Sequence, residues 1–305
     1  MYTLLFAFAL LFATIKPSFA SIPMASIAVD ADSGLVIKAD NADVQTYPAS
    51  LTKVMTLYMV FEALEKGWIT ENDMMKVSYN ASSKPSAKLW LKPNSEISVE
   101  DGIKAIITRS ANDVATVFAE HLGKSEENFA KMMTTVAKEL GMSSTTFKNA
   151  SGLHNSEQKT TARDLAILAM AIMNHFPQYY YLFSTRMFEF NNQKCFNHNR
   201  LLRTYSGADG IKTGFVQASG FNLITSAHRG GHRIVAVVLG RNSAKQRDKD
   251  MTKLLDKSFM SLIMSPDNIY IPPEKPNIEI LNDMENDSIF SLVNKKYNFK
   301  KITEN

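Results

Sequence analysis

The sequence predicts a single α/β domain whose antiparallel sheet takes strands from both ends of the chain. Apolar, β-branched runs occupy residues 24–38 and 221–239, each around a turn rich in Asp or Gly, which is the pattern of a β-hairpin. Segments with a helical apolar period fill the stretch between them. Strands at both ends with helices between favour one shared sheet, flanked by helices, over two separate domains.

The two hairpins and one long helix are the clearest elements. The first hairpin is expected to turn at residues 30–34, and the second at Gly230 and Gly231. Residues 49–66 read as a helix that is apolar on most of its circumference. A helix of this kind is buried on all sides, so we expect it in the middle of the domain.

Capping residues predict the starts of three further helices. Ser98, Ser125 and Thr161 each precede acidic residues in what would be a first helical turn. The expected helices run from 98 towards 108, from 125 to about 141, over 165–173 and, last, over 250–263.

Composition and charge restrict the possible functions. The chain has 305 residues, 45% hydrophobic and 21% charged, which is ordinary for a globular protein. A net charge of +4 gives no basic face, so nucleic acid is not an expected partner. Cys195 is the single cysteine, which excludes an intramolecular disulfide; we interpret it as a loop or semi-buried thiol.

The two ends of the chain differ from the rest. Residues 1–20 hold a short apolar run followed by Ser18-Phe19-Ala20, the pattern of a signal peptide cleaved near Ala20. We therefore expect an exported protein, soluble in the periplasm or cell envelope; an uncleaved N-terminal helix is the weaker interpretation. Residues 21–265 are the expected folded domain. Residues 266–305, rich in Pro, Asn and Asp, are expected to be a short extension without a stable membrane anchor.

The first chemical motif is Ser50-Leu51-Thr52-Lys53, within the expected buried helix. Residues three apart on a helix share a face, so the lysine amine lies within reach of the serine hydroxyl. A lysine whose pKa is lowered by burial can act as the base that makes serine a nucleophile. Free backbone N–H groups at a helix start can stabilise the negative oxygen of a transition state.

The same spacing recurs at Ser156 and Lys159, so the motif alone is weak. That second copy lies in a polar stretch with no apolar helix around it. We interpret it as a solvated loop.

Two more motifs follow in order. Ser110-Ala111-Asn112 comes just past the helix expected to end near 108, and we place it in a loop. Alone it is more often a turn or a cap. Lys212-Thr213-Gly214 leads into an apolar strand, where a lysine beside a glycine suits a carboxylate-bearing substrate.

Together the three motifs resemble the signature of penicillin-binding proteins and class A β-lactamases. From about residue 25 to 257 the chain resembles the serine-type D-alanyl-D-alanine carboxypeptidases, the low-molecular-weight penicillin-binding proteins. The resemblance implies the β-lactamase/D,D-peptidase fold, which adds a helical subdomain to the sheet. It also implies that terminal D-alanine is removed from a peptidoglycan stem peptide, with β-lactams as covalent inhibitors and without a metal or cofactor.

The resemblance also implies a role for each motif residue. Ser50 would be the nucleophile, Lys53 the general base, and Ser110 a member of the proton network. The backbone N–H groups of Ser50 and Phe215 would form the oxyanion hole. Substrate contacts would come from Asn112, Lys212, Thr213, Gly214 and Arg247.

Two positions depart from the family pattern. Phe215 stands where relatives often carry histidine or threonine. His198 stands where relatives often carry arginine, a role that the nearby Arg200 could take over.

Three other functions are weighed against the carboxypeptidase. A D,D-endopeptidase that cuts cross-links is the nearest alternative. A class A β-lactamase needs a further glutamate, and the sequence around 146–152 offers none. A non-catalytic cell-wall binding protein would be expected to lack motif residues, and all are present.

Overall fold

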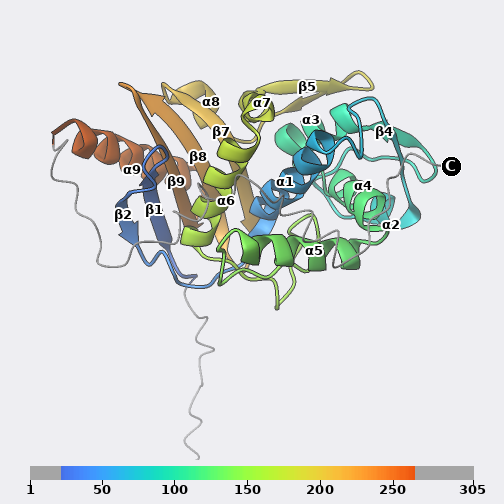
Figure 1. The fold of residues 1–305 in the computed structure, drawn as a ribbon, viewed down its shortest axis with the longest axis horizontal. Coiled ribbons are helices and arrows are strands. Elements are labelled where there is room, and N and C mark those ends of the chain that lie inside the picture. Colours follow the sequence, from blue (N-terminus) through green and yellow to red (C-terminus); the bar gives the residue numbers. More distant parts are fainter. Residues whose placement is uncertain (1–21, 265–305) are drawn as a thin grey trace, which may run out of the picture.

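The structure is a computed structural model and describes residues 22–264. The expected signal peptide at 1–20, its cleavage near Ala20 and the extension at 266–305 lie outside these residues. Within them the chain forms a five-stranded sheet with helices on both faces and a helical part beside it (Figure 1).

The sheet takes its strands from both ends of the described chain, as the sequence predicts. Its order is β2-β1-β9-β8-β7, and every neighbouring pair is antiparallel. The strands are β1 (Ala25–Asp30), β2 (Val36–Asp40), β7 (Ala208–Val216), β8 (Gly220–Arg229) and β9 (His232–Arg241). Strand β7 is therefore an edge strand, and one side of its backbone is open to the rest of the molecule.

Both faces of the sheet are covered, which explains the continuous apolar run in β9. Val235 and Val237 face the large core beneath α6 (Ala162–His175), whereas Ile234 and Ala236 pack with α9 (Ala244–Met264). Side chains alternate along a strand, so a strand covered on both sides needs apolar residues at every position.

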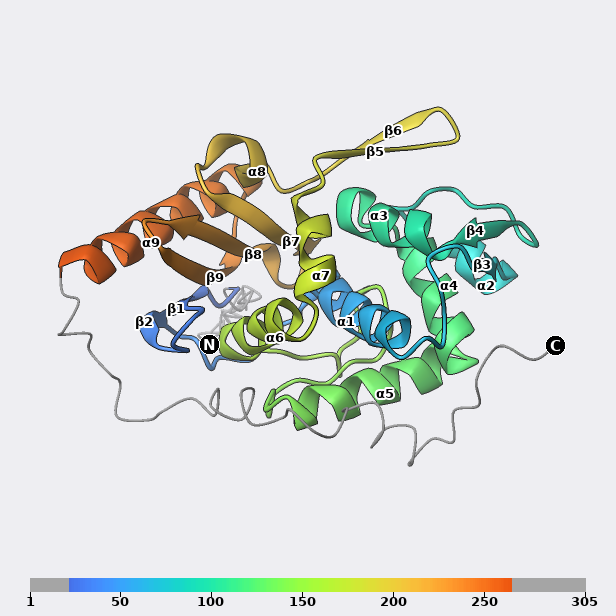
Figure 2. The same ribbon diagram turned by 45° about the horizontal axis from the view of Figure 1, so that its top comes forward.

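Apart from α8 (Leu201–Thr204), which packs against β7, the remaining elements form the helical part, with α1 at its centre (Figure 2). Helix α1 (Thr52–Glu65) is buried from Thr52 to Ala63, as expected for a helix apolar on most sides. The other members of this part are α2 (Tyr79–Ser83), α3 (Val99–Arg109), α4 (Asn112–Gly123), α5 (Glu126–Glu139), α7 (Pro177–Tyr180), and the 3-10 turns η1 (Ala49–Leu51) and η2 (Tyr181–Ser184). Two small antiparallel strand pairs complete the helical part: β3 (Met74–Lys76) with β4 (Glu96–Ser98), and the hairpin of β5 (Met187–Phe190) with β6 (Gln193–Phe196).

The three predicted helix starts are confirmed. The hydroxyls of Ser98, Ser125 and Thr161 each accept a backbone N–H from three residues later, at 3.1 Å in all three cases. Each bond satisfies one of the free N–H groups of a first helical turn.

The structure corrects two elements. Asn112 is not in a loop: it is the first residue of α4, so only Ser110 and Ala111 separate α3 from α4. Ser110 takes a left-handed conformation (φ 60°), which reverses the chain at once. The last helix begins at Ala244, earlier than 250, because the Ser243 hydroxyl accepts the N–H of Gln246 at 3.1 Å and caps it.

Candidate active site

Ser50 lies in the turn η1, directly before α1, where the edge strand β7 reaches the helical part. Two glycines let the chain pack closely around this turn. A Cβ on Gly152 would come within 1.8 Å of the Ala49 carbonyl oxygen, and one on Gly214 within 3.2 Å of the Ser50 nitrogen. Ala49 itself is left-handed (φ 49°), a strained conformation of the kind that concentrates at functional sites.

Lys53 is fully buried one turn further along, and its amine faces three acceptors. Its Nζ donates to Asn112 Oδ1 at 2.7 Å and to the Ser151 carbonyl. It also lies 3.1 Å from Ser50 Oγ, a hydroxyl that can accept or donate. The Asn112 amide is oriented by its own Nδ2, which donates to the Pro85 carbonyl at 2.8 Å. The two partners other than Ser50 are therefore fixed acceptors.

Burial lowers the pKa of Lys53 well below its ordinary value, and the positive charge of Lys212 lowers it further. A neutral amine has two N–H donors and one lone pair. The two donors are taken by Asn112 and Ser151, which cannot donate in return. The lone pair is then left for the hydroxyl of Ser50, which is the geometry of a general base poised on a nucleophile.

Ser110 is the other hydroxyl of the site. It is 5% exposed, and its Oγ has no hydrogen-bond partner among the described residues. A buried hydroxyl without a partner is costly, so such a group in a pocket points to a ligand atom that satisfies it.

Lys212, Thr213 and Gly214 lie in the middle of β7. Lys212 is buried, and its Nζ donates to the Thr213 carbonyl at 3.0 Å. Burial, together with the guanidinium of Arg247, lowers the pKa of Lys212 to about 7. The buried basic groups of Lys212 and Arg247 thus make this end of the pocket attractive to a carboxylate.

The low pKa of Lys212 predicts that burying this side chain lowers the stability of the folded protein at neutral pH. In the unfolded chain its pKa is ~10.4, so below pH ~7 both states are protonated and folding carries the full cost of burying the cation, about 5 kcal/mol. The cost fades as pH rises from ~7 to ~10.4, where the folded lysine is already neutral. Lys212→Met is therefore expected to raise Tm at pH 7 in calorimetry, with a gain that shrinks towards pH 10. A Tm of Lys212→Met at pH 7 that is equal to or below that of wild type would contradict this prediction.

A pocket of 410 Å³ joins these residues to solvent. Ser50, Ser110, Asn112, Thr213 and Arg247 all line it, and Lys53 and Lys212 lie buried behind them. The structure thus brings together the residues of the three motifs and Arg247, from four separate segments of the chain.

Residues that depart from the family pattern lie at the mouth of this pocket. Phe215 is 54% exposed, and its ring lies 4.4 Å from that of Phe221, its partner across β7 and β8. His198 and Arg200 line the same pocket. Desolvation, with Lys212 and Arg109 next in effect, lowers the pKa of His198 to about 4.

Sequence reasoning missed several lining residues. Among them are Ser86, Ala87, Leu153 and Phe221, and none of these belongs to a motif. Phe221 could have been inferred from the hairpin, because a tight turn at 217–219 places it opposite Phe215. The others come from loops whose positions depend on distant contacts.

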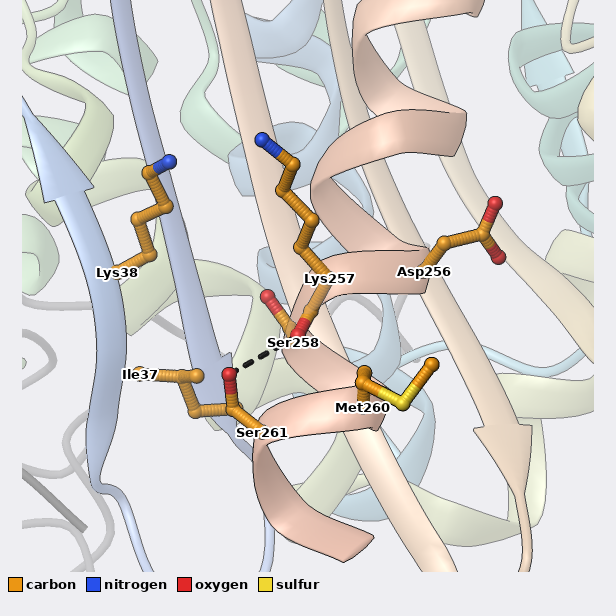
Figure 3. A pocket seen from close by; sticks show the side chains of 7 residues that line it. All are labelled: Ile37, Lys38, Asp256, Lys257, Ser258, Met260 and Ser261. Atoms are coloured by element: carbon orange, nitrogen blue, oxygen red, sulfur yellow. Dashed lines mark hydrogen bonds between the residues drawn. The ribbon is translucent and has the colours of Figure 1, made fainter. Parts of the chain in front are cut away.

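A second pocket lies between β2 and the last turns of α9 (Figure 3). Its serines are bonded to their own helix: Ser258 donates to Leu254 and Ser261 to Lys257, at 2.8 and 3.0 Å. It contains none of the predicted site residues.

Three further expectations concern residues 22–264. In this part of the chain no three or more His, Cys, Asp or Glu side chains are grouped so that they could hold a metal ion. None of the helices there has the length and apolarity to cross a membrane. Cys195 is buried on strand β6, not in a loop, and burial raises the pKa of its thiol.

The three motifs that meet at this pocket correspond to the motif set of penicillin-binding proteins and class A β-lactamases. The chain belongs to the D-alanyl-D-alanine carboxypeptidase family (Peptidase S11), whose model matches residues 15–243. This confirms the family and the fold class predicted from the sequence.

Curated relatives agree. The chain is 35% identical over 238 residues to the D-alanyl-D-alanine carboxypeptidase DacF of Bacillus subtilis, covering 77% of this chain and 61% of that protein. It is 38% identical over 240 residues to DacC of Escherichia coli, covering 76% and 60%. The chain thus spans about three fifths of the length of these relatives.

Solved structures give the same result. The carboxypeptidase DacD of Francisella tularensis superposes with a TM-score of 0.76 at 30% identity, covering 81% of this chain and 72% of that one. Penicillin-binding protein D2 of Listeria monocytogenes, in its cefotaxime-bound form, gives 0.72 at 32% identity, covering 80% and 100%.

Proposed function

We propose that this chain is a serine-type D-Ala-D-Ala carboxypeptidase that removes the terminal D-alanine of peptidoglycan pentapeptide. The observation that carries the proposal is the set of contacts at Lys53, two of whose partners are fixed acceptors and the third Ser50. The names of its relatives support the substrate class.

In the acylation step, Ser50 Oγ attacks the carbonyl carbon of the penultimate D-alanine while Lys53 takes the hydroxyl proton. The backbone N–H groups of Ser50 and Phe215 stabilise the resulting oxyanion. The amide bond then breaks, and the leaving amine receives a proton that passes from Lys53 through Ser110. D-alanine departs, and the peptide remains as an ester on Ser50.

In the deacylation step, water attacks the ester and Lys53 takes its proton. Collapse of the second oxyanion breaks the bond to Ser50 Oγ, which recovers a proton from Lys53. The enzyme is restored, with tetrapeptide as the product. Because the lysine starts neutral in both steps, its lowered pKa supports this role.

Substrate orientation would come from the cationic end of the pocket. Lys212, Thr213 and Arg247 would hold the carboxylate of the terminal D-alanine, and Asn112 and Gly214 would contact the peptide. Arg247 is 5% exposed and is held by Asp248 at 2.6 Å, which fixes its guanidinium at the pocket wall.

β-lactams would acylate the same serine, and the cefotaxime-bound relative supports this extension. The substrate belongs to the cell wall, so the enzyme would act in the periplasm or cell envelope, in cell-wall biogenesis and remodelling. The signal-peptide pattern at residues 1–20 supports that location. A β-lactamase activity finds no support, since no Asp or Glu is among the residues that line the described pocket.

The test is a comparison of two substrates. Purified protein is expected to release D-alanine from monomeric pentapeptide, measured by chromatography of the products. A cross-linked dimer should be cut much more slowly. Cleavage of the dimer alone would overturn the proposal in favour of a D,D-endopeptidase.

A further inference from the structure

The carboxylate of Glu126, at the first turn of α5, touches three separate segments around the site. Its Oε2 lies 2.6 Å from Lys84 Nζ. Its Oε1 accepts the backbone N–H of Ala150 at 3.2 Å and faces the Thr116 hydroxyl at 3.3 Å. Only 13% of its side chain is exposed, so these contacts are largely removed from water.

Two of these contacts are made by residues that directly precede a carbonyl group bonded to a site residue. Lys84 precedes Pro85, whose carbonyl accepts from Asn112 Nδ2 at 2.8 Å. Ala150 precedes Ser151, whose carbonyl accepts from Lys53. The third contact also reaches Asn112, because the Thr116 hydroxyl lies 3.2 Å from the Asn112 backbone carbonyl.

We propose that Glu126 is a positioning residue: its one carboxylate joins the loops at 84–87 and 150–152, and so fixes the acceptors around Lys53. The proposal rests on the proposed function, because it assigns Glu126 to the acylation of Ser50. A displacement of about 1 Å in such a site costs up to about 100-fold in rate.

Glu126→Gln removes the ion pair with Lys84 and keeps the hydrogen bond from the backbone N–H of Ala150. The amide oxygen still accepts from Ala150, but the amide nitrogen would face the Lys84 ammonium, donor against donor. Its matched control is Glu127→Gln, the next residue in the same helical turn, whose carboxylate is exposed and pairs with Lys131 at 2.8 Å. Both variants remove one charge from the helix start, and only the first touches the loops.

The experiment measures acylation by a fluorescent penicillin across pH, with Tm as a check on folding. Glu126→Gln is expected to lower the maximal acylation rate about 30-fold, whereas Glu127→Gln stays within about twofold of wild type. Lys84→Met should lower the rate to a similar degree, and the double variant should be no worse than Glu126→Gln, because both remove one interaction.

The pH profile separates positioning from a merely structural role. Lys53 is faced by the charges of Lys212 on β7, Asp113 on α4 and Glu126 on α5, and it lies in range of His198. The negative charge of Glu126 raises the pKa of Lys53, so its removal should move the acid limb of acylation to lower pH. Lys84→Met keeps that charge and should not produce this shift.

A readout independent of activity is hydrogen exchange. Glu126→Gln should lose amide protection in both loops, 84–87 and 150–152, and Glu127→Gln in neither. The proposal would be overturned if Glu126→Gln had the acylation rates, pH profile and amide protection of wild type. It would also be overturned if this variant had a lowered Tm while the rates, the pH profile and the amide protection were unchanged. If wild-type protein fails to react with penicillin, the proposed function is wrong. Hydrogen exchange would still show whether Glu126 holds the two loops together.

Discussion

Ser50→Ala is expected to abolish labelling by a fluorescent penicillin and release of D-alanine from pentapeptide. The reason is chemical: the variant lacks the hydroxyl that lies 3.1 Å from Lys53 Nζ in wild type, so no acyl-enzyme can form. The measurement is in-gel fluorescence after incubation with the labelled antibiotic, together with mass spectrometry of the intact protein. Wild type should gain the mass of one ring-opened β-lactam, and the variant none.

The chain supplies its own control for this experiment. Ser156 has the same spacing to Lys159 as Ser50 has to Lys53, but Ser156 is exposed in a turn and Lys159 lies over the Tyr47 ring at 3.6 Å. Ser156→Ala should label like wild type. Equal labelling of Ser50→Ala and wild type would refute the assignment of the nucleophile.

Local pattern was sufficient to predict most of the fold. Helix caps such as Ser98 and Thr161 act through bonds to residues three positions away, so they are visible in the sequence. The central position of α1 followed from its apolar circumference, and the shared sheet followed from hairpins at both ends. Each of these inferences needed only contacts that are short in sequence or a pattern of burial.

The motif residues could also be predicted from local sequence pattern. The residues that hold them in place could not. Nothing in the sequence around Ala150 shows that Ser151 lends its carbonyl to Lys53, 98 positions away. Glu126 looked like an ordinary acidic residue behind an N-cap, as its neighbour Glu127 indeed is. What separates the two is the direction in which each side chain points, and that depends on how α5 packs beside α4.

The start of α4 was missed because two signals competed at Ser110 and Asn112. Serine and asparagine are common in turns, which favoured a loop. The structure resolves the competition through Asp113, which is fully buried in the first turn of α4 and accepts the backbone N–H groups of Leu89 and Leu91 at 3.1 and 3.2 Å. These bonds come from a segment more than 20 residues earlier, and no local pattern encodes them.

Lys53→Met should slow acylation of Ser50 by about 1,000-fold, within the range expected for loss of a general base. Methionine has a similar length and suits a buried site, so penicillin can still enter the pocket while the hydroxyl keeps its proton. Stopped-flow fluorescence with the labelled penicillin measures the rate, and Tm confirms folding. Lys159→Met, at the second copy of the motif, is the matched control and should react at the wild-type rate.

The same variant tests the protonation state of Lys53. In wild type the base must be neutral, so acylation should fall as pH drops through the lowered pKa of Lys53 and level off above it. In Lys53→Met the remaining slow reaction should lack this acid limb, because the group that titrates is gone. An unchanged acid limb in Lys53→Met would assign the titration to another group, with His198 the first candidate since its pKa is also lowered and it lines the same pocket. Wild-type rates in that variant would remove Lys53 from the mechanism altogether.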